Sequence, residues 1–315
     1  MKVAFFASDK IAIESIKVLM HSSICELACV VSNPDREKGR GKKLSPNDVS
    51  AFALDNDIKL FRPNKNEEDL LVEDFYALGI DVIFVMAYGS ILRDGILNYG
   101  NYCLNLHGSI LPEFRGASPV ECAIATGKAK TGVCLMKIGK RMDAGDVADC
   151  KEISIEDSDT AQSLREKIGI LASEVLAENL EKISNQQLQF TPQDEAKATY
   201  VRKLNKGDLY LDFNKTAREL FNRIRGFSSG IFTYENLDIK VLKTSFEPLN
   251  KSMQVGEILC DGSSLKIACK DSLLNILELQ KPCAKSMSIK DFLKGFVFKN
   301  GDILASAKNE EVLRF

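Results

Sequence analysis

The stretch that decides the fold is Tyr102–Pro112, which reads YCLNLHGSILP. It begins with mostly apolar residues, as in a strand buried in a sheet, and its glycine and proline then end the strand in a loop. Side chains two residues apart on a strand point to the same side, so Asn105 and His107 would face one site. An amide donor and an imidazole can stabilise an oxyanion and move a proton. The stretch therefore predicts a catalytic site at the end of a buried strand.

A carboxylate further along the chain completes this set of groups. Asp143 lies 36 residues after His107, in the segment MDAGD, and a carboxylate beside an imidazole can orient the ring and stabilise its cation. Asp146 lies in the same segment and is the rival candidate. The other histidine of the chain, His21, follows an amphipathic stretch, where a solvated or helix-capping role is expected.

The first 150 residues alternate short apolar runs with amphipathic segments such as Ile11–Met20 and Val49–Asn56. The apolar runs are Lys2–Ala7, Glu26–Ser32, Asp81–Met86, Tyr102–Leu106 and Thr131–Ile138. This alternation is typical of βαβ units and predicts an α/β, Rossmann-like domain with a mostly parallel sheet. Ligands of such sheets bind beyond the carboxyl ends of the strands, where both Tyr88-Gly89 and Asn105-Leu106-His107 would lie.

The second half of the chain has a different pattern. Apolar residues at helical spacing predict a long helix over Asp157–Ile183, followed by a polar stretch, Gln186–Tyr200. A short helix over Thr216–Arg225 precedes five expected strands: Ile231–Tyr234, Ile239–Leu242, Gly256–Cys260, Ser264–Cys269 and Leu273–Gln280. Short strands separated by turns predict a small antiparallel, OB-like β-barrel. We expect a catalytic domain over residues 1–188, a linker over 189–206 and a second domain over 207–315.

The bulk properties exclude several classes of protein. No apolar run approaches the roughly 20 residues that cross a bilayer, so no membrane association is expected. The nine cysteines are scattered singly, which favours a reducing cytoplasm with neither a disulfide framework nor a zinc site. Residues 201–315 carry 19 Lys and Arg against 14 Asp and Glu, a net charge of +5 in a chain of net charge −2. This asymmetry hints at a polyanionic partner.

A second motif follows the second expected strand. Asn33–Pro46 reads NPDREKGRGKKLSP and holds five cations, Arg36, Lys38, Arg40, Lys42 and Lys43. Most such runs are solvated loops. A dinucleotide-binding loop is disfavoured, because the third glycine and the following helix are missing. The composition instead suits a segment without a fixed conformation that becomes ordered on a nucleic-acid backbone.

These motifs together resemble the formyltransferases that use 10-formyltetrahydrofolate, and among them the methionyl-tRNA formyltransferases. The resemblance rests on Asn-x-His, the turn Ser109–Pro112, the later Asp143-Ala-Gly and the basic loop, and it runs through the whole chain. Two segments depart from the family pattern. Phe6–Ala12 lacks the usual glycine and proline, and Arg225–Gly230 stands where the family has Asn-Pro-Trp-Pro.

The resemblance implies a function and a set of site residues. Asn105, His107 and Asp143 would be catalytic, and no metal would be needed. The folate-binding residues would be Met86, Ala87, Tyr88, Gly89, Ser109, Ile110, Leu111, Pro112, Arg141 and Met142. The five cations of the basic loop would bind tRNA.

The implied substrates are 10-formyltetrahydrofolate and initiator methionyl-tRNA, with no role for DNA, and a monomer is expected. Three alternatives stay open: a sugar-nucleotide formyltransferase, a formyltetrahydrofolate hydrolase of the same fold, and a tRNA-binding protein without catalysis.

Overall fold

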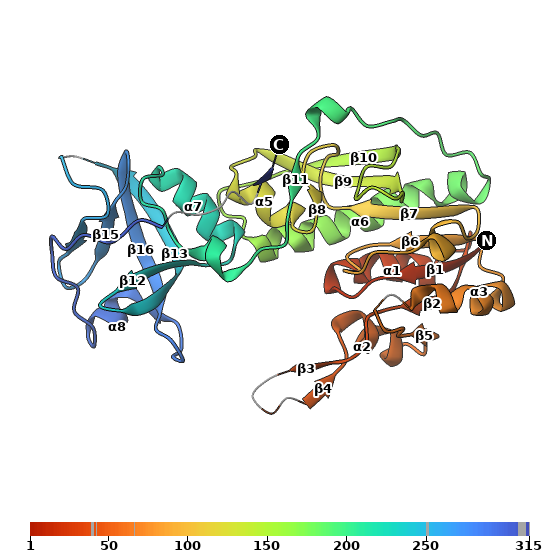
Figure 1. Ribbon diagram of the computed structural model, residues 1–315, viewed down its shortest axis with the longest axis horizontal. Coiled ribbons are helices and arrows are strands. Elements are labelled where there is room, and N and C mark those ends of the chain that lie inside the picture. Colours follow the sequence, from red (N-terminus) through yellow and green to blue (C-terminus); the bar gives the residue numbers. More distant parts are fainter. Residues whose placement is uncertain (39–40, 42, 66, 250–251, 308–312, 315) are drawn as a thin grey trace. The chain divides into compact units, whose positions relative to one another are not determined.

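The chain forms two compact units. The computed structural model, shown in Figure 1, describes residues 1–38, 41, 43–65, 67–249, 252–307 and 313–314. The first unit comprises Met1–Ala117, Thr131–Ile153 and Arg165–Tyr200, and the second comprises Ser118–Lys130, Ser154–Leu164 and Val201–Phe315. Within the described part of the chain, no helix is both long and apolar enough to cross a membrane.

The first unit is built on a seven-stranded sheet of order β10-β9-β7-β6-β1-β2-β5. Its strands are β1 (Lys2–Phe6), β2 (Glu26–Val31), β5 (Leu60–Phe61), β6 (Val82–Val85), β7 (Tyr102–His107), β9 (Lys130–Lys137) and β10 (Val147–Ser154). The five strands from β5 to β7 are parallel, and β9 runs antiparallel to β7. This arrangement confirms the predicted α/β fold with its mostly parallel sheet.

Strand β10 was not predicted from the sequence. It lies at one end of the strand order and alternates half-buried with exposed residues, among them Lys151 and Glu152. Lys151 pairs with Glu178 and lies 3.7 Å from Glu174, both on the long helix α6 (Ala161–Ser184). Charged residues are usual on edge strands, so β10 lacks the apolar signal of a buried strand.

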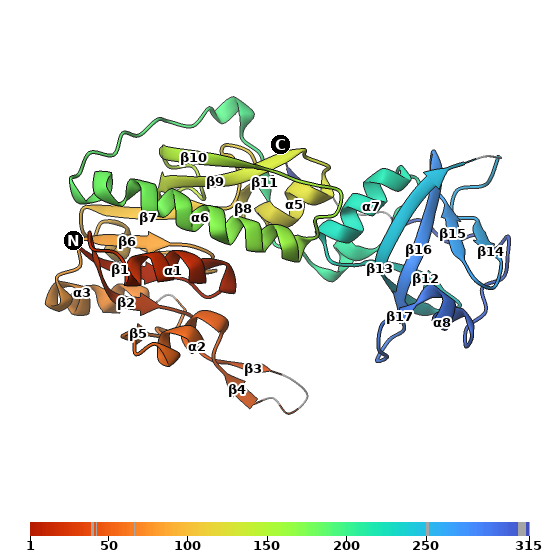
Figure 2. The same cartoon turned by 180° about the vertical axis from the view of Figure 1, so that it is seen from behind.

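Helices pack on the sheet and fix its loops. They are α1 (Ile13–Met20), α2 (Asp48–Asp55), α3 (Val72–Leu78), α4 (Asp94–Leu97) and α6, with 3-10 turns η1 (Lys10–Ala12), η2 (Glu68–Leu71) and η3 (Glu195–Lys197). Figure 2 shows α1 and α6 side by side on one face of the sheet. Gly169 of α6 lies close to the turn η1 that precedes α1, because a Cβ there would lie 2.8 Å from the Ile11 carbonyl oxygen. Helix α6 begins later than predicted, with the Thr160 hydroxyl accepting from the Ser163 N–H.

The second unit holds a curled antiparallel sheet of order β12-β13-β16-β15-β14. Its strands are β12 (Gly230–Tyr234), β13 (Leu237–Pro248), β14 (Ile258–Cys260), β15 (Leu265–Ala268) and β16 (Ser272–Gln280), with β17 (Met287–Ser288) paired to β16. Its helical elements are α5 (Pro119–Ala125), η4 (Lys206–Leu209), α7 (Ala217–Gly226) and α8 (Ile289–Leu293). Short strands β8 (Arg115–Gly116), β11 (Tyr200–Val201) and β18 (Leu313–Arg314) complete the chain's elements apart from one hairpin treated below. The five predicted strands and their helix are all present, as a small barrel-like domain requires.

The segment Arg225–Gly230, which departs from the family pattern, has a structural explanation within the second unit. Arg225 is buried, and its Nη1 donates to the carbonyl oxygens of Glu156 and Asp159. A Cβ at Gly226 would lie 2.8 Å from the Ala125 nitrogen, so glycine allows α7 to lie directly against α5. Arg225 therefore ties α7 to the segment that holds Glu156 and Asp159, and Gly226 allows α7 to approach α5.

The fold predicts an unequal response to two leucine substitutions. Leu104 is fully buried in β7, whereas Leu54 in α2 is 53% exposed. Leu104→Ala should lower the free energy of unfolding by about 2–5 kcal/mol, because it removes buried methyl groups and leaves a cavity. Leu54→Ala should cost roughly 0.5 kcal/mol or less. Urea unfolding followed by circular dichroism measures both, and equal losses would contradict the burial of β7.

Candidate active site

The site is built on the carboxyl end of β7. In the parallel pairing of β6 with β7, Val85 lies opposite Asn105, and in the antiparallel pairing of β7 with β9, Cys134 lies opposite His107. The strand pairs with β6 as far as Asn105 and with β9 as far as His107, which fixes the direction of both polar side chains. Asn105 and His107 face the same side, as the two-residue spacing predicts.

The structure brings Asn105, His107 and Asp143 together. Asp143 Oδ1 accepts a hydrogen bond from Asn105 Nδ2 at 3.4 Å, and its Oδ2 lies 3.7 Å from His107 Nδ1. The opposite ring nitrogen, His107 Nε2, lies 3.0 Å from the Phe114 carbonyl oxygen. The imidazole is only 5% exposed. Both ring nitrogens therefore face oxygen acceptors, and protonation of the ring would add an ion pair with Asp143.

The Asp143 carboxylate has a fixed orientation. Its Oδ2 also accepts a hydrogen bond of 2.8 Å from the Gly116 N–H. Asp146 takes part in the same loop through its backbone, where its carbonyl oxygen accepts from the Lys137 N–H. The carboxylate within 4 Å of the imidazole is thus that of Asp143 rather than that of its rival.

Comparison with known proteins shows the family of this chain. A model of the formyl transferase family matches residues 1–180, and a model of the formyl transferase C-terminal domain matches residues 203–297. The chain belongs to the formyl transferase family.

Similar sequences cover nearly the whole chain. A methionyl-tRNA formyltransferase of Sulfurihydrogenibium sp. (strain YO3AOP1) is 35% identical over 310 residues, covering 96% of this chain and 99% of that protein. A methionyl-tRNA formyltransferase of Methylococcus capsulatus (strain ATCC 33009 / NCIMB 11132 / Bath) is 35% identical over 297 residues, covering 93% of this chain and 96% of that protein.

Solved structures share the fold at lower identity. The sugar 3N-formyl transferase WlaRD, solved in the presence of dTDP and 5-N-formyl-THF, has a TM-score of 0.65 at 20% identity. The match covers 90% of this chain and 99% of the WlaRD chain. HypX from Aquifex aeolicus, in complex with tetrahydrofolic acid, has a TM-score of 0.61 at 14% identity, covering 97% of this chain and 50% of that one.

The segments predicted to bind folate have unequal exposure in this formyltransferase. Met86 and Tyr88 are buried, whereas Ala87 and Gly89 are exposed and have positive φ angles. Burial raises the pKa of Tyr88, and the neighbouring Glu68 carboxylate, which accepts from its hydroxyl group, raises it further. The Tyr88 hydroxyl is therefore neutral, and its hydrogen bond to Glu68 holds the loop that follows β6. A ligand at the carboxyl end of β6 would contact the exposed backbone of Ala87 and Gly89 rather than the Tyr88 side chain.

The turn Ser109–Pro112 lies against β9. Ser109 is buried, and its hydroxyl group donates to the Glu113 carbonyl oxygen at 2.6 Å, while Ile110, Leu111 and Pro112 are half-buried. The Leu111–Pro112 peptide bond is cis. In contrast, Arg141 and Met142 are exposed, Met142 at 56%. These two side chains lie in the loop that carries Asp143.

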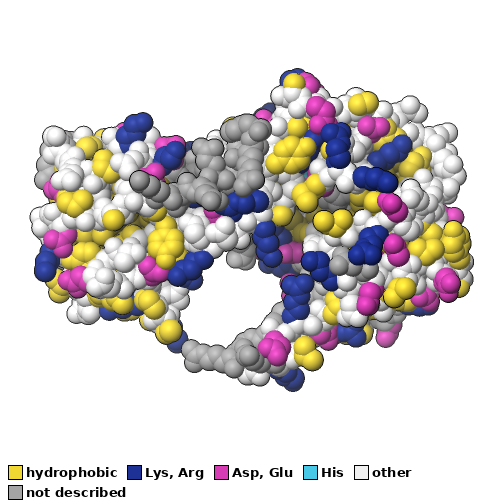
Figure 3. Space-filling model, viewed as in Figure 1, with side chains coloured by type: hydrophobic (Ala, Val, Ile, Leu, Met, Phe, Trp, Pro, Cys, Tyr) yellow, Lys and Arg dark blue, Asp and Glu magenta, His cyan; other side chains and the backbone are white. Residues whose placement is uncertain are grey.

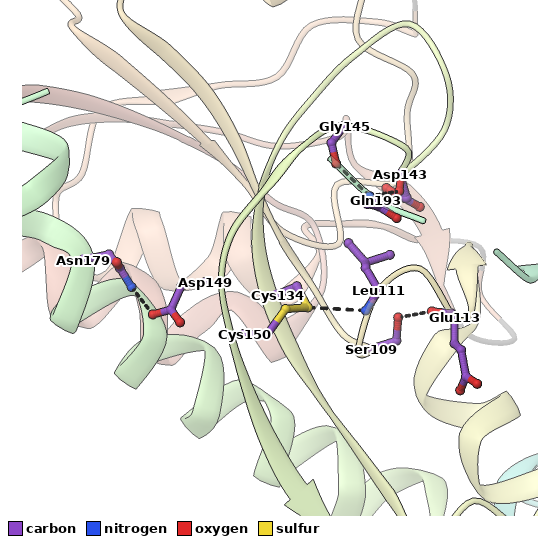
Figure 4. Close-up of a disulfide and its surroundings, with 10 residues drawn as sticks. All are labelled: Ser109, Leu111, Glu113, Cys134, Asp143, Gly145, Asp149, Cys150, Asn179 and Gln193. Carbon is purple, nitrogen blue, oxygen red and sulfur yellow. Dashed lines mark hydrogen bonds between the residues drawn. A yellow bond between two sulfur atoms is a disulfide. The ribbon is translucent and has the colours of Figure 1, made fainter. Parts of the chain in front are cut away.

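The cysteines form one disulfide, which the sequence analysis did not predict. Cys134 of β9 and Cys150 of β10 are joined, as Figure 4 shows, and the other seven cysteines are free. The two residues lie on neighbouring strands 16 positions apart in sequence, a spacing that carries no recognisable pattern. The Leu111 N–H donates to Cys134 Sγ at 3.4 Å, so the disulfide lies directly beneath the turn Ser109–Pro112.

The basic loop differs from its prediction as well. Arg36–Lys38 (β3) and Lys43–Ser45 (β4) pair as an antiparallel hairpin, in which Arg36 lies opposite Ser45. The expectation that this segment lacks a fixed conformation is therefore wrong for these two strands. Their pairing depends on backbone hydrogen bonds, which the amino-acid composition does not reveal. Asp35 anchors the hairpin through an ion pair of 2.7 Å with Arg62. Arg36 and Lys43 are exposed, whereas Arg40, Lys42 and the side chain of Lys38 lie outside the described residues.

Sequence analysis missed the residues that surround Arg115. This side chain is fully buried, and it donates to Glu195 through Nη1 and Nη2 and to the Tyr200 hydroxyl at 2.7 Å. The hydrogen bonds from Arg115 lower the pKa of Glu195, so the carboxylate stays charged at neutral pH. The polar composition of Gln186–Tyr200 gave no sign that this segment packs against the site.

The geometry predicts which aspartate matters. Asp143→Asn should lower the rate of formyl transfer by at least about 10²-fold, because an amide cannot stabilise an imidazolium. Asp146→Asn should stay close to wild type, because Asp146 contributes a carbonyl oxygen that the substitution keeps. Single-turnover rates of formyl transfer, measured for both variants, test this assignment. An active Asp143→Asn beside a dead Asp146→Asn would reverse the assignment.

Proposed function

We propose that this formyltransferase moves a formyl group from 10-formyltetrahydrofolate to the α-amino group of initiator methionyl-tRNA. The observation that carries the proposal is the contact of Asn105, His107 and Asp143 at the carboxyl end of β7. Full-length relatives named methionyl-tRNA formyltransferase support the choice of acceptor.

The chemistry follows from the three side chains. The neutral amine attacks the formyl carbon, and the carbon–oxygen double bond becomes an oxyanion. Asn105 Nδ2 carries two hydrogens, so it can donate one to Asp143 and the other to the oxyanion. The bond from the formyl carbon to N10 of the folate then breaks, and the proton lost by the amine goes to N10.

His107 and Asp143 would carry that proton. His107 either takes it from the amine or, when protonated, shares the oxyanion with Asn105. Asp143 orients the ring and stabilises its cation, since the Gly116 N–H holds the carboxylate toward it. The exposed backbone at Ala87 and Gly89, the turn Ser109–Pro112 and the side chains of Arg141 and Met142 would bind the folate.

The second substrate is a polyanion, and the hairpin β3–β4 would bind it. Arg36 and Lys43 are exposed there, and Lys38, Arg40 and Lys42 belong to the same motif. On the face shown in Figure 3, several Lys and Arg side chains lie close together on the first unit. The net charge of +5 over residues 201–315 suits a tRNA-binding role for residues 207–315, after a linker over 189–206.

We further propose that the enzyme is a cytoplasmic monomer. Seven of its nine cysteines are free, which suits a reducing compartment despite the one disulfide.

A competing acceptor is the amino group of a nucleotide-linked sugar. This alternative is motivated by the fold that the chain shares with WlaRD and with an N-formyltransferase of Helicobacter canadensis. The sequence identity to each of these two proteins is 20% or less. Hydrolysis of the formyl donor by water is the other alternative.

An acceptor assay tests the function. With 10-formyltetrahydrofolate as donor, initiator methionyl-tRNA should be formylated, while dTDP-amino sugars and water should be poor acceptors. Asn105→Ala should lower turnover by about 10²–10³-fold and His107→Ala by about 10²–10⁴-fold. Faster transfer to the amino sugar than to methionyl-tRNA would refute the proposal.

A salt titration tests the hairpin. Arg36→Ala and Lys43→Ala should each weaken tRNA binding and reduce the slope of log Kd against log salt by about 1, since each removes one phosphate contact. Lys182→Ala, an exposed lysine at the end of α6, is the matched control and should leave the slope unchanged. Folate affinity should be the same in all three variants. An unchanged slope in both hairpin variants would make the hairpin a solvated surface.

A further inference from the structure

The loop that carries Asp143 has a conformation that its own residues do not favour. Asp143 has a φ of +48°, in the left-handed region, which is unfavourable for a residue with a side chain. Gly145 packs so closely on β9 that a Cβ there would lie 2.0 Å from the Lys137 carbonyl oxygen. Something outside the loop must therefore stabilise this turn.

Gln193 provides that stabilisation. Its Nε2 donates to the carbonyl oxygens of Asp143 at 2.9 Å and Gly145 at 2.7 Å, as Figure 4 shows. Its Oε1 accepts from Arg115 Nε at 3.0 Å. Both amide hydrogens are used, and they hold the two carbonyl groups that flank the turn.

Arg115 links this contact to the Asp143 side chain. Arg115 is fully buried, and its guanidinium is fixed by Glu195 and Tyr200. The next residue, Gly116, donates its N–H to Asp143 Oδ2. Gln193 thus holds the backbone of Asp143. Gly116, which follows the Gln193 partner Arg115 in sequence, holds the Asp143 carboxylate.

We propose that Gln193 is a positioning residue for formyl transfer, which acts by holding the Asp143 carboxylate toward His107. The inference deepens the proposed function and rests on it. Gln193 touches no reacting atom in this scheme. Its effect reaches the reaction only through Asp143.

Two substitutions separate this role from simple packing. Gln193→Leu removes all three hydrogen bonds at nearly constant size. Gln193→Glu keeps the acceptor for Arg115 but replaces the amide donor with an oxygen that faces two carbonyl oxygens. Gln189→Leu, at an exposed position of the same segment, is the matched control.

We expect both Gln193 variants to lower kcat by about 30-fold, because both lose the two hydrogen bonds to the Asp143 loop and each is worth roughly a factor of five. The KM for methionyl-tRNA should change little, the melting temperature should fall by only a few degrees, and Gln189→Leu should match wild type. If Gln193→Glu keeps the wild-type kcat, the residue serves only Arg115 and the inference is overturned. A wild-type kcat in Gln193→Leu would overturn it as well.

A double-mutant cycle with Asp143→Asn gives the second test. Residues that act through one group have non-additive effects. In single-turnover assays, Gln193→Leu should therefore slow Asp143→Asn by less than about threefold. A full further loss of about 30-fold would show that Gln193 acts independently of Asp143. A wild-type enzyme that transfers no formyl group would instead refute the proposed function, so the two failures are distinct.

Discussion

The register of strand β7 is the constraint on which the site depends. Parallel pairing with β6 sets Asn105 opposite Val85, and antiparallel pairing with β9 sets His107 opposite Cys134. A shift of one residue would turn both polar side chains to the opposite face of the sheet. Because β7 is buried and hydrogen-bonded on both sides, neither side chain can be moved without breaking the sheet. The geometry of the candidate site is thus a property of the sheet, to which the loop of Asp143 is added.

That loop is held beside β7 by hydrogen bonds that involve main-chain groups. The Gly116 N–H binds the Asp143 carboxylate, and the Gln193 amide binds the carbonyl oxygens of Asp143 and Gly145. The turn Ser109–Pro112 is held in the same way, by the Ser109 hydroxyl and by the contact of the Leu111 N–H with Cys134. Both of these loops are therefore held by hydrogen bonds that involve main-chain atoms.

Much of this could be predicted from the sequence, because it depends on short-range patterns. Alternating apolar runs indicate the parallel sheet, and two-residue spacing indicates that Asn105 and His107 share a face. Regular turns indicate the antiparallel strands of the second unit. The function was accessible through the motif of Asn105, His107 and Asp143 together with the basic loop.

The remainder depends on contacts between distant segments that composition does not encode. Edge strand β10 is too polar to resemble a buried strand. The disulfide joins residues whose spacing has no pattern, and pairing of Arg36–Lys38 with Lys43–Ser45 is not visible in a run of cations and glycines. The role of Gln193 depends on a polar segment that folds back 50 residues after Asp143.

The buried charge of Arg115 also sets a limit on where the catalytic unit can end. Its side-chain hydrogen-bond partners are Gln193, Glu195 and Tyr200, all of them well beyond residue 180, where the match to the family's N-terminal model stops. A chain cut at that point would leave a buried guanidinium without its counter-charge, at a cost of roughly 3–5 kcal/mol. The smallest catalytic unit that could be made on its own is therefore about twenty residues longer than the boundary that sequence similarity suggests.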